Sequence, residues 1–302
     1  MIVNNYPAEN KVKKIIRSIV KKVPIGQQIL REREQRFINT ENMKYKAQFY
    51  KNFDMGFDEQ PGTVQIETIN RCNGTCSFCP VNRNIDPRST TIMSDDIFGK
   101  IIDDLRALNY SGRIGLFSNN EPLLDKQILK RVKAAREACP NSYIYFYTNG
   151  TLLDEAFFLE ASKYMDRIEI DDYNDELLLS ENLKTIVKLC ENDEKLNDIA
   201  RIQLRKENEV LFTRGGQSPN NNKRVERDYP CFLPFCQMVI RPDGKVSLCC
   251  SDALGKYTLG DVREQSILEI WNSDKYRDIR RRVLEDITSI DLCRFCDSKH
   301  LE

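Results

Sequence analysis

The sequence predicts an α/β fold, in which an open partial (β/α) barrel is followed by a small cysteine-rich C-terminal domain. Strand-like and helix-like segments alternate between residues 63 and 204, which is typical of a parallel sheet with right-handed crossovers. The predicted strands and helices are too few to close an eight-stranded barrel, so an abbreviated, open sheet is expected. Cysteines gather over residues 72–79 and again over 231–296.

The predicted elements follow one another in short units. Strands are expected over residues 64–69, 113–117, 142–147, 167–170 and 199–204. Helices are expected after a Ser94 cap, over residues 127–138, from Asp154 and over 178–187. Polar residues follow these strands directly, and in parallel β/α folds such strand ends form the site.

Composition limits the possible functions. The 302 residues include 46 basic and 46 acidic side chains, so no attraction to nucleic acid is implied. No apolar run is long enough to span a membrane and no signal peptide is evident, so a soluble, cytoplasmic protein is expected. The single histidine, His300, argues against histidine-based catalysis. Eleven cysteines in such a protein indicate metal binding rather than disulfides.

The domain boundaries are expected near residues 60 and 222. Residues 1–60 form a basic helical extension, with apolar residues at near-helical spacing over 12–20 and a second helix over 26–37. We expect this extension to cover part of the main domain; weak contact with an anionic membrane surface or a polyanionic carrier is the alternative. The barrel is expected over 61–222, and the cysteine-rich domain over 223–300. Residues 301–302 resemble the scar of a purification tag.

The strongest motif is a run of three cysteines, Cys72, Cys76 and Cys79, directly after the first predicted strand. Three thiolates in C-x3-C-x2-C spacing can bind three irons of a [4Fe–4S] cluster and leave the fourth iron open for another ligand. A zinc site would normally have four ligands in two pairs, which fits this loop less well.

With Phe78 before its third cysteine, this loop resembles the signature of the radical S-adenosylmethionine (SAM) superfamily. The resemblance implies that the open iron binds SAM and that SAM cleavage produces a radical that takes a hydrogen atom from the substrate. It also implies a flavodoxin-type or ferredoxin-type reductant.

Further candidate SAM ligands lie at later strand ends. The segment Asn119-Asn120-Glu121-Pro122 occupies the place of the family's Gly-Gly-Glu-Pro motif, which binds the SAM ammonium group; the first two residues are asparagine here rather than glycine. Thr148-Asn149-Gly150 resembles a strand-end triplet near the SAM pocket. The remaining candidates are Gln203 and Arg214 for SAM binding, and Asp171 and Arg205 for catalysis.

The C-terminal domain holds a second cysteine set. Asp243-Gly244 predicts a hairpin turn that brings Cys231 and Cys249 together at its open end. Cys293 and Cys296 complete a set that suffices for one auxiliary [4Fe–4S] cluster. The pattern resembles the SPASM/twitch extension of radical SAM enzymes, in its one-cluster form; a zinc ribbon is the alternative. Cys236 and Cys250 lie beside these ligands: one of them could replace Cys231 or Cys249, and whichever is free could supply hydrogen to a substrate radical or pack as a small apolar side chain.

The combination of a short barrel and a one-cluster extension resembles the 2-deoxy-scyllo-inosamine dehydrogenases and the aminoglycoside epimerases of this superfamily. Both groups take hydrogen from a carbinol C–H of a cyclitol or sugar, free or carrier-linked. Epimerisation is slightly favoured, because Cys250 or Cys236 is available as a hydrogen donor. Dehydrogenation to a ketone is the first alternative and peptide modification the second. A non-catalytic iron–sulfur scaffold represents a different class.

Overall fold

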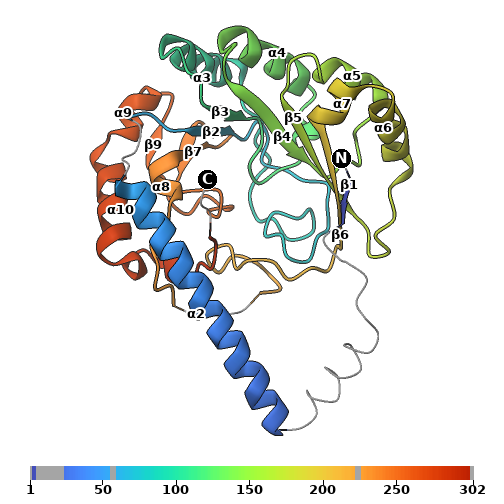
Figure 1. Ribbon diagram of the computed structural model, residues 1–302. Coiled ribbons are helices and arrows are strands. Elements are labelled where there is room, and N and C mark those ends of the chain that lie inside the picture. Colours follow the sequence, from blue (N-terminus) through green and yellow to red (C-terminus); the bar gives the residue numbers. More distant parts are fainter. Residues whose placement is uncertain (1, 5–23, 55–58, 222–225, 300–302) are drawn as a thin grey trace.

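A computed structural model describes residues 2–4, 24–54, 59–221 and 226–299 (Figure 1). Its sheet has nine described strands in the order β1-β6-β5-β4-β3-β2-β7-β8-β9. The predicted helix over residues 12–20, His300 and the tag-like end lie outside the described residues. The strands are β1 (Ile2–Asn4), β2 (Thr63–Ile66), β3 (Arg113–Gly115), β4 (Tyr143–Thr148), β5 (Arg167–Tyr173), β6 (Ala200–Arg205), β7 (Gln237–Ile240), β8 (Lys245–Ser247) and β9 (Gly260–Asp261).

The strands from β1 to β7 pair in parallel, as the alternation of strands and helices predicts. β7 continues this sheet beside β2, so the sheet extends past the linker around Gly215-Gly216 into the cysteine-rich region. β8 then turns back antiparallel to β7 at Gly244, whose φ of +81° suits glycine. The predicted hairpin is therefore confirmed.

Helices cover the outer side of the parallel strands in Figure 1. Apolar residues spaced three and four apart on these helices face the sheet. Ile101 and Leu105 of α3 (Asp95–Ala107), for example, are fully buried. The described helices are α2 (Pro24–Asp54), α3 (Asp95–Ala107), η1 (Pro122–Leu124), α4 (Ile128–Ala138), α5 (Glu155–Ala161), α6 (Glu181–Glu191), α7 (Glu194–Ile199), α8 (Leu233–Cys236), α9 (Ile267–Trp271), α10 (Asp274–Glu285), η2 (Ile287–Ser289) and α11 (Asp291–Arg294).

Strand β5 is longer than the sequence predicts. Asp171 and Asp172 were expected to follow a strand that ends at Ile170, but both belong to the strand and pair with Gln203 and Leu204 of β6. Asp172 is buried, and its carboxylate is satisfied by hydrogen bonds from the N–H (2.8 Å) and hydroxyl (2.6 Å) of Ser180. Asp171 is half-buried, and both residues line one cavity.

Helix α2 joins the N-terminal extension to the cysteine-rich region. It includes the predicted helix over residues 26–37 but runs on to Asp54, and in Figure 1 its first half projects away from the rest of the molecule. Near its end, Phe49 is fully buried against Phe232 and Phe235, with ring centroids 5.4 and 6.1 Å away. Tyr45 packs edge-on against Tyr229 in the same way.

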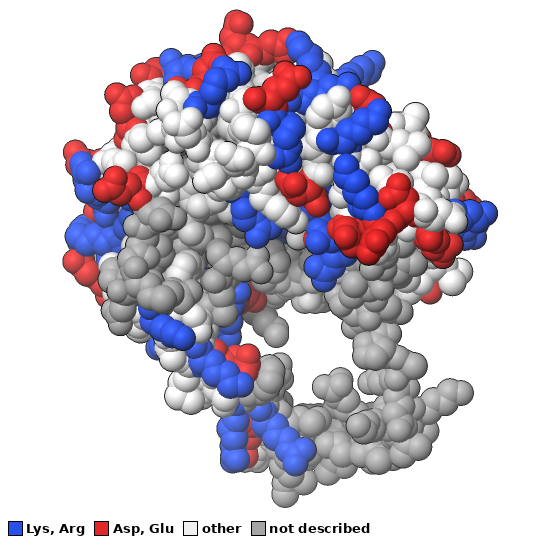
Figure 2. Space-filling model, turned by 45° about the horizontal axis from the view of Figure 1, so that its top comes forward, with Lys and Arg blue, Asp and Glu red and all other residues white. Residues whose placement is uncertain are grey.

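The surface carries both signs of charge. On the face shown in Figure 2, Lys and Arg side chains are interspersed with Asp and Glu. Within the described part of the chain, no helix combines the length and the apolar character needed to cross a membrane.

Candidate active site

A cavity of about 900 Å³ lies at the carboxyl ends of the parallel strands. It brings together the cysteine loop after β2, the polar segments after β3 and β4, and four residues of the cysteine-rich region, Leu233, Gln237, Cys250 and Lys299. The candidate residues that line it are Cys72, Cys76, Phe78, Cys79, Asn119, Asn120, Glu121, Asn149, Asp171, Arg205, Arg214 and Cys250. Gln203, Cys236 and the four predicted auxiliary ligands are not among its lining residues.

The three cysteines of the loop lie near one another, around Gly74. A Cβ placed on Gly74 would lie 3.3 Å from Sγ of Cys72 and 3.8 Å from Sγ of Cys76, so both sulfurs lie beside the backbone of this glycine. Burial, and then the proximity of Cys79 and Cys72, raises the pKa of the Cys76 thiol to about 12. Thiols with so high a pKa keep their protons at neutral pH and lose them when the sulfurs bind a metal.

Three cysteines in one loop can contribute ligands either to a single metal ion or to a cluster. A lone zinc ion holds thiolate sulfurs at about 2.3 Å, which brings the sulfurs close to one another. Among the described residues, no group of three His, Cys, Asp or Glu side chains is arranged to hold one metal ion. A [4Fe–4S] cluster, with a separate iron for each thiolate, keeps its ligands farther apart. The loop fits that cluster.

Two strand-end segments meet at Glu121, which is 1% exposed. Its carboxylate accepts hydrogen bonds from the hydroxyl of Thr148 (2.8 Å), the N–H of Asn149 (2.7 Å) and the N–H of Leu123 (3.0 Å). Burial raises the pKa of Glu121 to about 7. A carboxylate has about four acceptor positions, so one remains for a ligand donor in the cavity.

Asn149 connects this corner to the cysteine loop. Its Nδ2 donates to Oδ1 of Asn73 (2.7 Å) and lies 3.8 Å from Sγ of Cys72, within hydrogen-bond distance of a sulfur. The N–H of Gly74 donates to the same sulfur at 3.3 Å. Hydrogen bonds to ligating sulfurs are one of the factors that set the potential of an iron–sulfur cluster.

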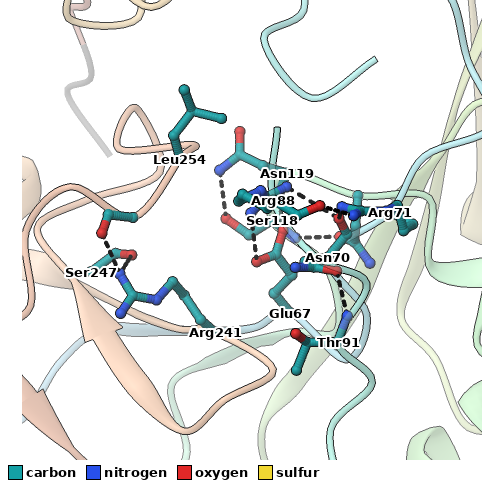
Figure 3. A network of polar contacts seen from close by, with 12 residues as sticks. Glu67, Asn70, Arg71, Arg88, Thr91, Ser118, Asn119, Arg241, Ser247 and Leu254 are labelled. Carbon is teal, nitrogen blue, oxygen red and sulfur yellow. Dashed lines mark hydrogen bonds and ion pairs between the residues drawn. The ribbon is translucent and has the colours of Figure 1, made fainter. Parts of the chain in front are cut away.

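Asn119 lies at the centre of the polar network in Figure 3. Its backbone N–H donates to Oε1 of Glu67 (3.1 Å), and Glu67 is 4.0 Å from the guanidinium of Arg88. Its Nδ2 donates to the carbonyl of Cys250 (2.9 Å), and its Oδ1 accepts from Arg214. The asparagine at the family's glycine position therefore links the barrel to the cysteine-rich region.

Arg214 is held in the cavity by a tight turn. Its φ of +48° is in the left-handed region, which costs a non-glycine residue about 1–3 kcal/mol and concentrates at functional sites. Gly215 follows with φ +61°, and a Cβ there would lie 2.5 Å from the carbonyl oxygen of Leu292. Burial raises the pKa of the Cys250 thiol to about 11, and the positive charge of the Arg214 guanidinium opposes this rise. Arg214 and Cys250 are therefore neighbours.

Asp171 and Arg205 lie together on the other wall of the cavity. Their charged atoms are 3.7 Å apart, and Arg205 forms a two-pronged bond to Glu209 at 3.1 and 2.9 Å. Burial raises the pKa of Asp171 against the attraction of Arg205. The ring of Phe78 packs 5.9 Å from Tyr173, whose hydroxyl donates to Asp171 at 3.4 Å. Sequence reasoning missed Glu209, which no motif marks.

The predicted auxiliary ligands form a separate buried group beside Cys250. Burial raises the pKa of Cys249 well above its usual value, and Cys250, Cys293, Cys231 and Cys296 raise it further, so all these thiols are neighbours. Cys231, Cys249, Cys293 and Cys296 are each less than a tenth exposed. Four buried, neighbouring thiols match the number of ligands that one [4Fe–4S] cluster needs. Cys236 lies close to Cys231 and Cys250, and its Sγ lies 3.9 Å from the carbonyl of Leu233.

Sequence reasoning also missed Arg227, a buried cation beside these cysteines. The charges of Cys231 and Cys296 raise the pKa of Arg227, whereas burial alone would lower it. The only signal in the sequence is its position four residues before Cys231.

Comparisons with known proteins agree with this geometry. Residues 66–188 match the model of the radical SAM superfamily, and residues 231–297 match that of SPASM, an iron–sulfur cluster-binding domain. The S-adenosyl-L-methionine-dependent 2-deoxy-scyllo-inosamine dehydrogenase of Niallia circulans is 26% identical over 239 residues, which cover 78% of this chain and 92% of that protein.

Solved structures show the same fold. The crystal structure of BtrN in complex with AdoMet and 2-DOIA superposes with a TM-score of 0.70 at 24% identity, covering 81% of this chain and 97% of that one. Native anSMEcpe with bound AdoMet gives a TM-score of 0.54 at 13% identity, covering 78% of this chain and 92% of that one. The open sheet of the radical SAM type is thereby confirmed.

The two domains also imply cofactors. A radical SAM domain implies SAM and a [4Fe–4S] cluster, and a SPASM domain implies auxiliary iron–sulfur binding. Both cysteine groups fit these assignments. The chain therefore carries a radical SAM domain over residues 66–188 and, behind it, a SPASM iron–sulfur cluster-binding domain over residues 231–297.

Proposed function

We propose that this enzyme takes a hydrogen atom from a carbinol C–H of an aminocyclitol or sugar and completes the reaction as a dehydrogenation to a ketone. The observation that carries the proposal is the single cavity that joins the cysteine loop to Cys250, the neighbour of the auxiliary cysteines. The Niallia circulans relative, of which this chain covers 92%, is a dehydrogenase of such an alcohol.

The proposed ligands follow from the two cysteine groups. Cys72, Cys76 and Cys79 would hold the cluster that binds SAM, with Glu121 and Asn149 beside the polar groups of SAM. One auxiliary cluster would be held by Cys231, Cys249, Cys293 and Cys296. When bound, these groups supply a radical that abstracts hydrogen and an acceptor for one electron.

The cavity wall suits a polyhydroxylated substrate. Asp171, Arg205 and Arg214 line it together with Tyr147, and they offer both acceptors and donors to hydroxyl and amino groups. Arg214, fixed on Asn119 beside Cys250, is positioned to hold a carbinol oxygen at the border of the two domains. The carbinol must also lose a proton, and the half-buried Asp171, whose pKa is raised by desolvation, is the carboxylate in this wall best suited to accept it.

Epimerisation, which the sequence slightly favours, is the second candidate because of Cys250. This thiol lines the cavity, whereas Cys236 is not among the lining residues. In an epimerisation, Cys250 would return a hydrogen atom to the opposite face of the substrate carbon.

Product analysis in deuterated water tests the proposal. The reconstituted enzyme would be given SAM, a reductant and 2-deoxy-scyllo-inosamine. Dehydrogenation predicts a ketone, which has no hydrogen at the reacting carbon, and it predicts that Cys250→Ala retains turnover. An epimer carrying one deuterium at that carbon, lost in Cys250→Ala but not in the control Cys236→Ala, would instead establish epimerisation. SAM cleavage without conversion of this alcohol would contradict the proposed substrate class.

A further inference from the structure

Arg227 is a buried cation at the auxiliary cysteines. It is 4% exposed, and its guanidinium donates hydrogen bonds to three carbonyl oxygens: Nε to Tyr229 (2.8 Å), Nη2 to Pro230 (2.8 Å) and Nη1 to Cys296 (3.2 Å). Its guanidinium also stacks 4.2 Å over the ring of Tyr229. Within the described residues no carboxylate forms an ion pair with it. A buried guanidinium without a negative partner is strongly unfavourable, so an anion is expected close by.

The neighbours of Arg227 supply that anion only when metal is bound. The guanidinium is fixed beside two of these cysteines: Nη2 bonds to the carbonyl of Pro230, the residue before Cys231, and Nη1 bonds to the carbonyl of Cys296 itself. These thiols are neutral while they keep their protons, and metal binding turns them into thiolates. Four thiolates carry more negative charge than the iron–sulfur core cancels, so the filled site is an anion.

The other cations near this site have partners elsewhere. Arg282 lies near Cys293 but is 3.8 Å from Asp278 and bonds to Ser289. Arg214 lies near Cys250 and bonds to Asn119. Arg227 alone in this group combines near-complete burial with contacts to the loops on both sides of the cysteines.

We propose that Arg227 is the fixed counter-charge of the auxiliary cluster and raises its reduction potential, so that the cluster accepts an electron more readily. A nearby positive charge stabilises the reduced, more negative state of a cluster, and net charge is a recognised determinant of such potentials. Arginine keeps its charge at every working pH, so the effect is permanent. This inference deepens the proposed function but rests on the auxiliary cluster, not on the identity of the substrate.

A redox titration of the auxiliary cluster tests the role of Arg227. In the full-length chain with Cys72, Cys76 and Cys79 changed to Ala, only auxiliary iron remains to be followed by electron paramagnetic resonance. Arg227→Gln should shift the midpoint potential to a more negative value, whereas Arg227→Lys, which keeps the charge, should shift it less. Arg280→Gln is the control, because Arg280 is another arginine of this domain that bonds to a backbone carbonyl, that of Pro234 (2.9 Å), and stacks on an aromatic ring, that of Trp271.

Thermal unfolding separates charge from packing. Removing an unpaired buried charge should leave the iron-free protein as stable as before or more so, and should destabilise only the iron-loaded form. If Arg227→Gln does not retain iron but its iron-free form is stable, the result would support the role of Arg227 as counter-charge of the cluster. An unchanged potential, equal shifts in the Lys and Gln variants, or unfolding of the iron-free Gln variant would overturn it. None of these measurements needs the substrate, so their outcome is independent of the product analysis in deuterated water that tests the proposed function.

Discussion

The hydroxyl of Thr148 donates a 2.8 Å hydrogen bond to the carboxylate of Glu121, and thereby ties the ends of two neighbouring strand–loop units together. Glu121 also accepts from the backbone of Asn149. The residue predicted to bind SAM is therefore also the residue that fixes the shape of this corner, and any ligand contact of its own must use the remaining acceptor position.

Glu121→Gln should weaken SAM binding about ten- to hundred-fold, equivalent to about 1.5–3 kcal/mol for a hydrogen bond to a charged group. The amide cannot offer the same acceptors to Asn149 and also carries no charge for an ammonium group. Calorimetric titration of the reconstituted protein with SAM measures the affinity, and iron content should not change. Glu169→Gln, on β5 but not among the cavity-lining residues, serves as the control. Equal SAM affinities in wild type and Glu121→Gln would mean that Asn119-Asn120-Glu121-Pro122 is only a structural turn.

The Cys72, Cys76 and Cys79 triple alanine variant should keep about half of the iron and lose all SAM cleavage, since only the auxiliary site would remain. Iron and sulfide analysis after anaerobic reconstitution measures the loss. A Cys139→Ala, Cys190→Ala double variant should keep full iron, because both of these buried cysteines belong to helix–sheet packing. Full iron in the triple variant would disprove the ligand assignment.

The sequence was sufficient for the cysteine groups and for the strand ends that surround them, because both depend on local spacing. It was not sufficient where the position or role of a residue depends on tertiary contacts. β1 lies beside β6 although about 200 residues separate them in the chain, and no local pattern announces that pairing. Asp172 occupies a buried position of β5 because Ser180 satisfies its carboxylate, and a search for apolar alternation does not find such a position. Arg227 is an ordinary surface residue in the sequence and a buried one in the fold.

Phe49→Ala should destabilise the protein by about 3–5 kcal/mol, because it empties a fully buried site between α2 and the segment before β7. It should also speed the loss of auxiliary iron, since Phe232 directly follows Cys231. Met43→Ala, on the same helix and 63% exposed, should change stability by no more than about 0.5 kcal/mol. Urea unfolding and iron release to a chelator measure both effects. Similar values for the two variants would mean that α2 does not support the cluster domain.

Glu67→Gln should make stability less dependent on pH. Burial raises the pKa of Glu67 to about 8, and the opposing attraction of Arg88 is weaker. The folded protein therefore binds this proton more tightly than the unfolded chain, whose carboxyl has a pKa near 4.5. Between these two values the stability of the wild type falls as pH rises, by a total on the order of a few kcal/mol.

The glutamine variant has no such proton, so its stability relative to wild type should increase from pH 5.5 to pH 9. Asp86→Asn provides a control of opposite sign in the same network. Hydrogen bonds and charge from Arg88 and Arg71 lower the pKa of Asp86 despite its burial, so its carboxylate stabilises the fold above the pKa of the unfolded chain. The asparagine variant should therefore be less stable than wild type across this range. Urea unfolding at several pH values distinguishes the two. A constant difference between wild type and Glu67→Gln from pH 5.5 to 9 would show that Glu67 keeps the same charge throughout.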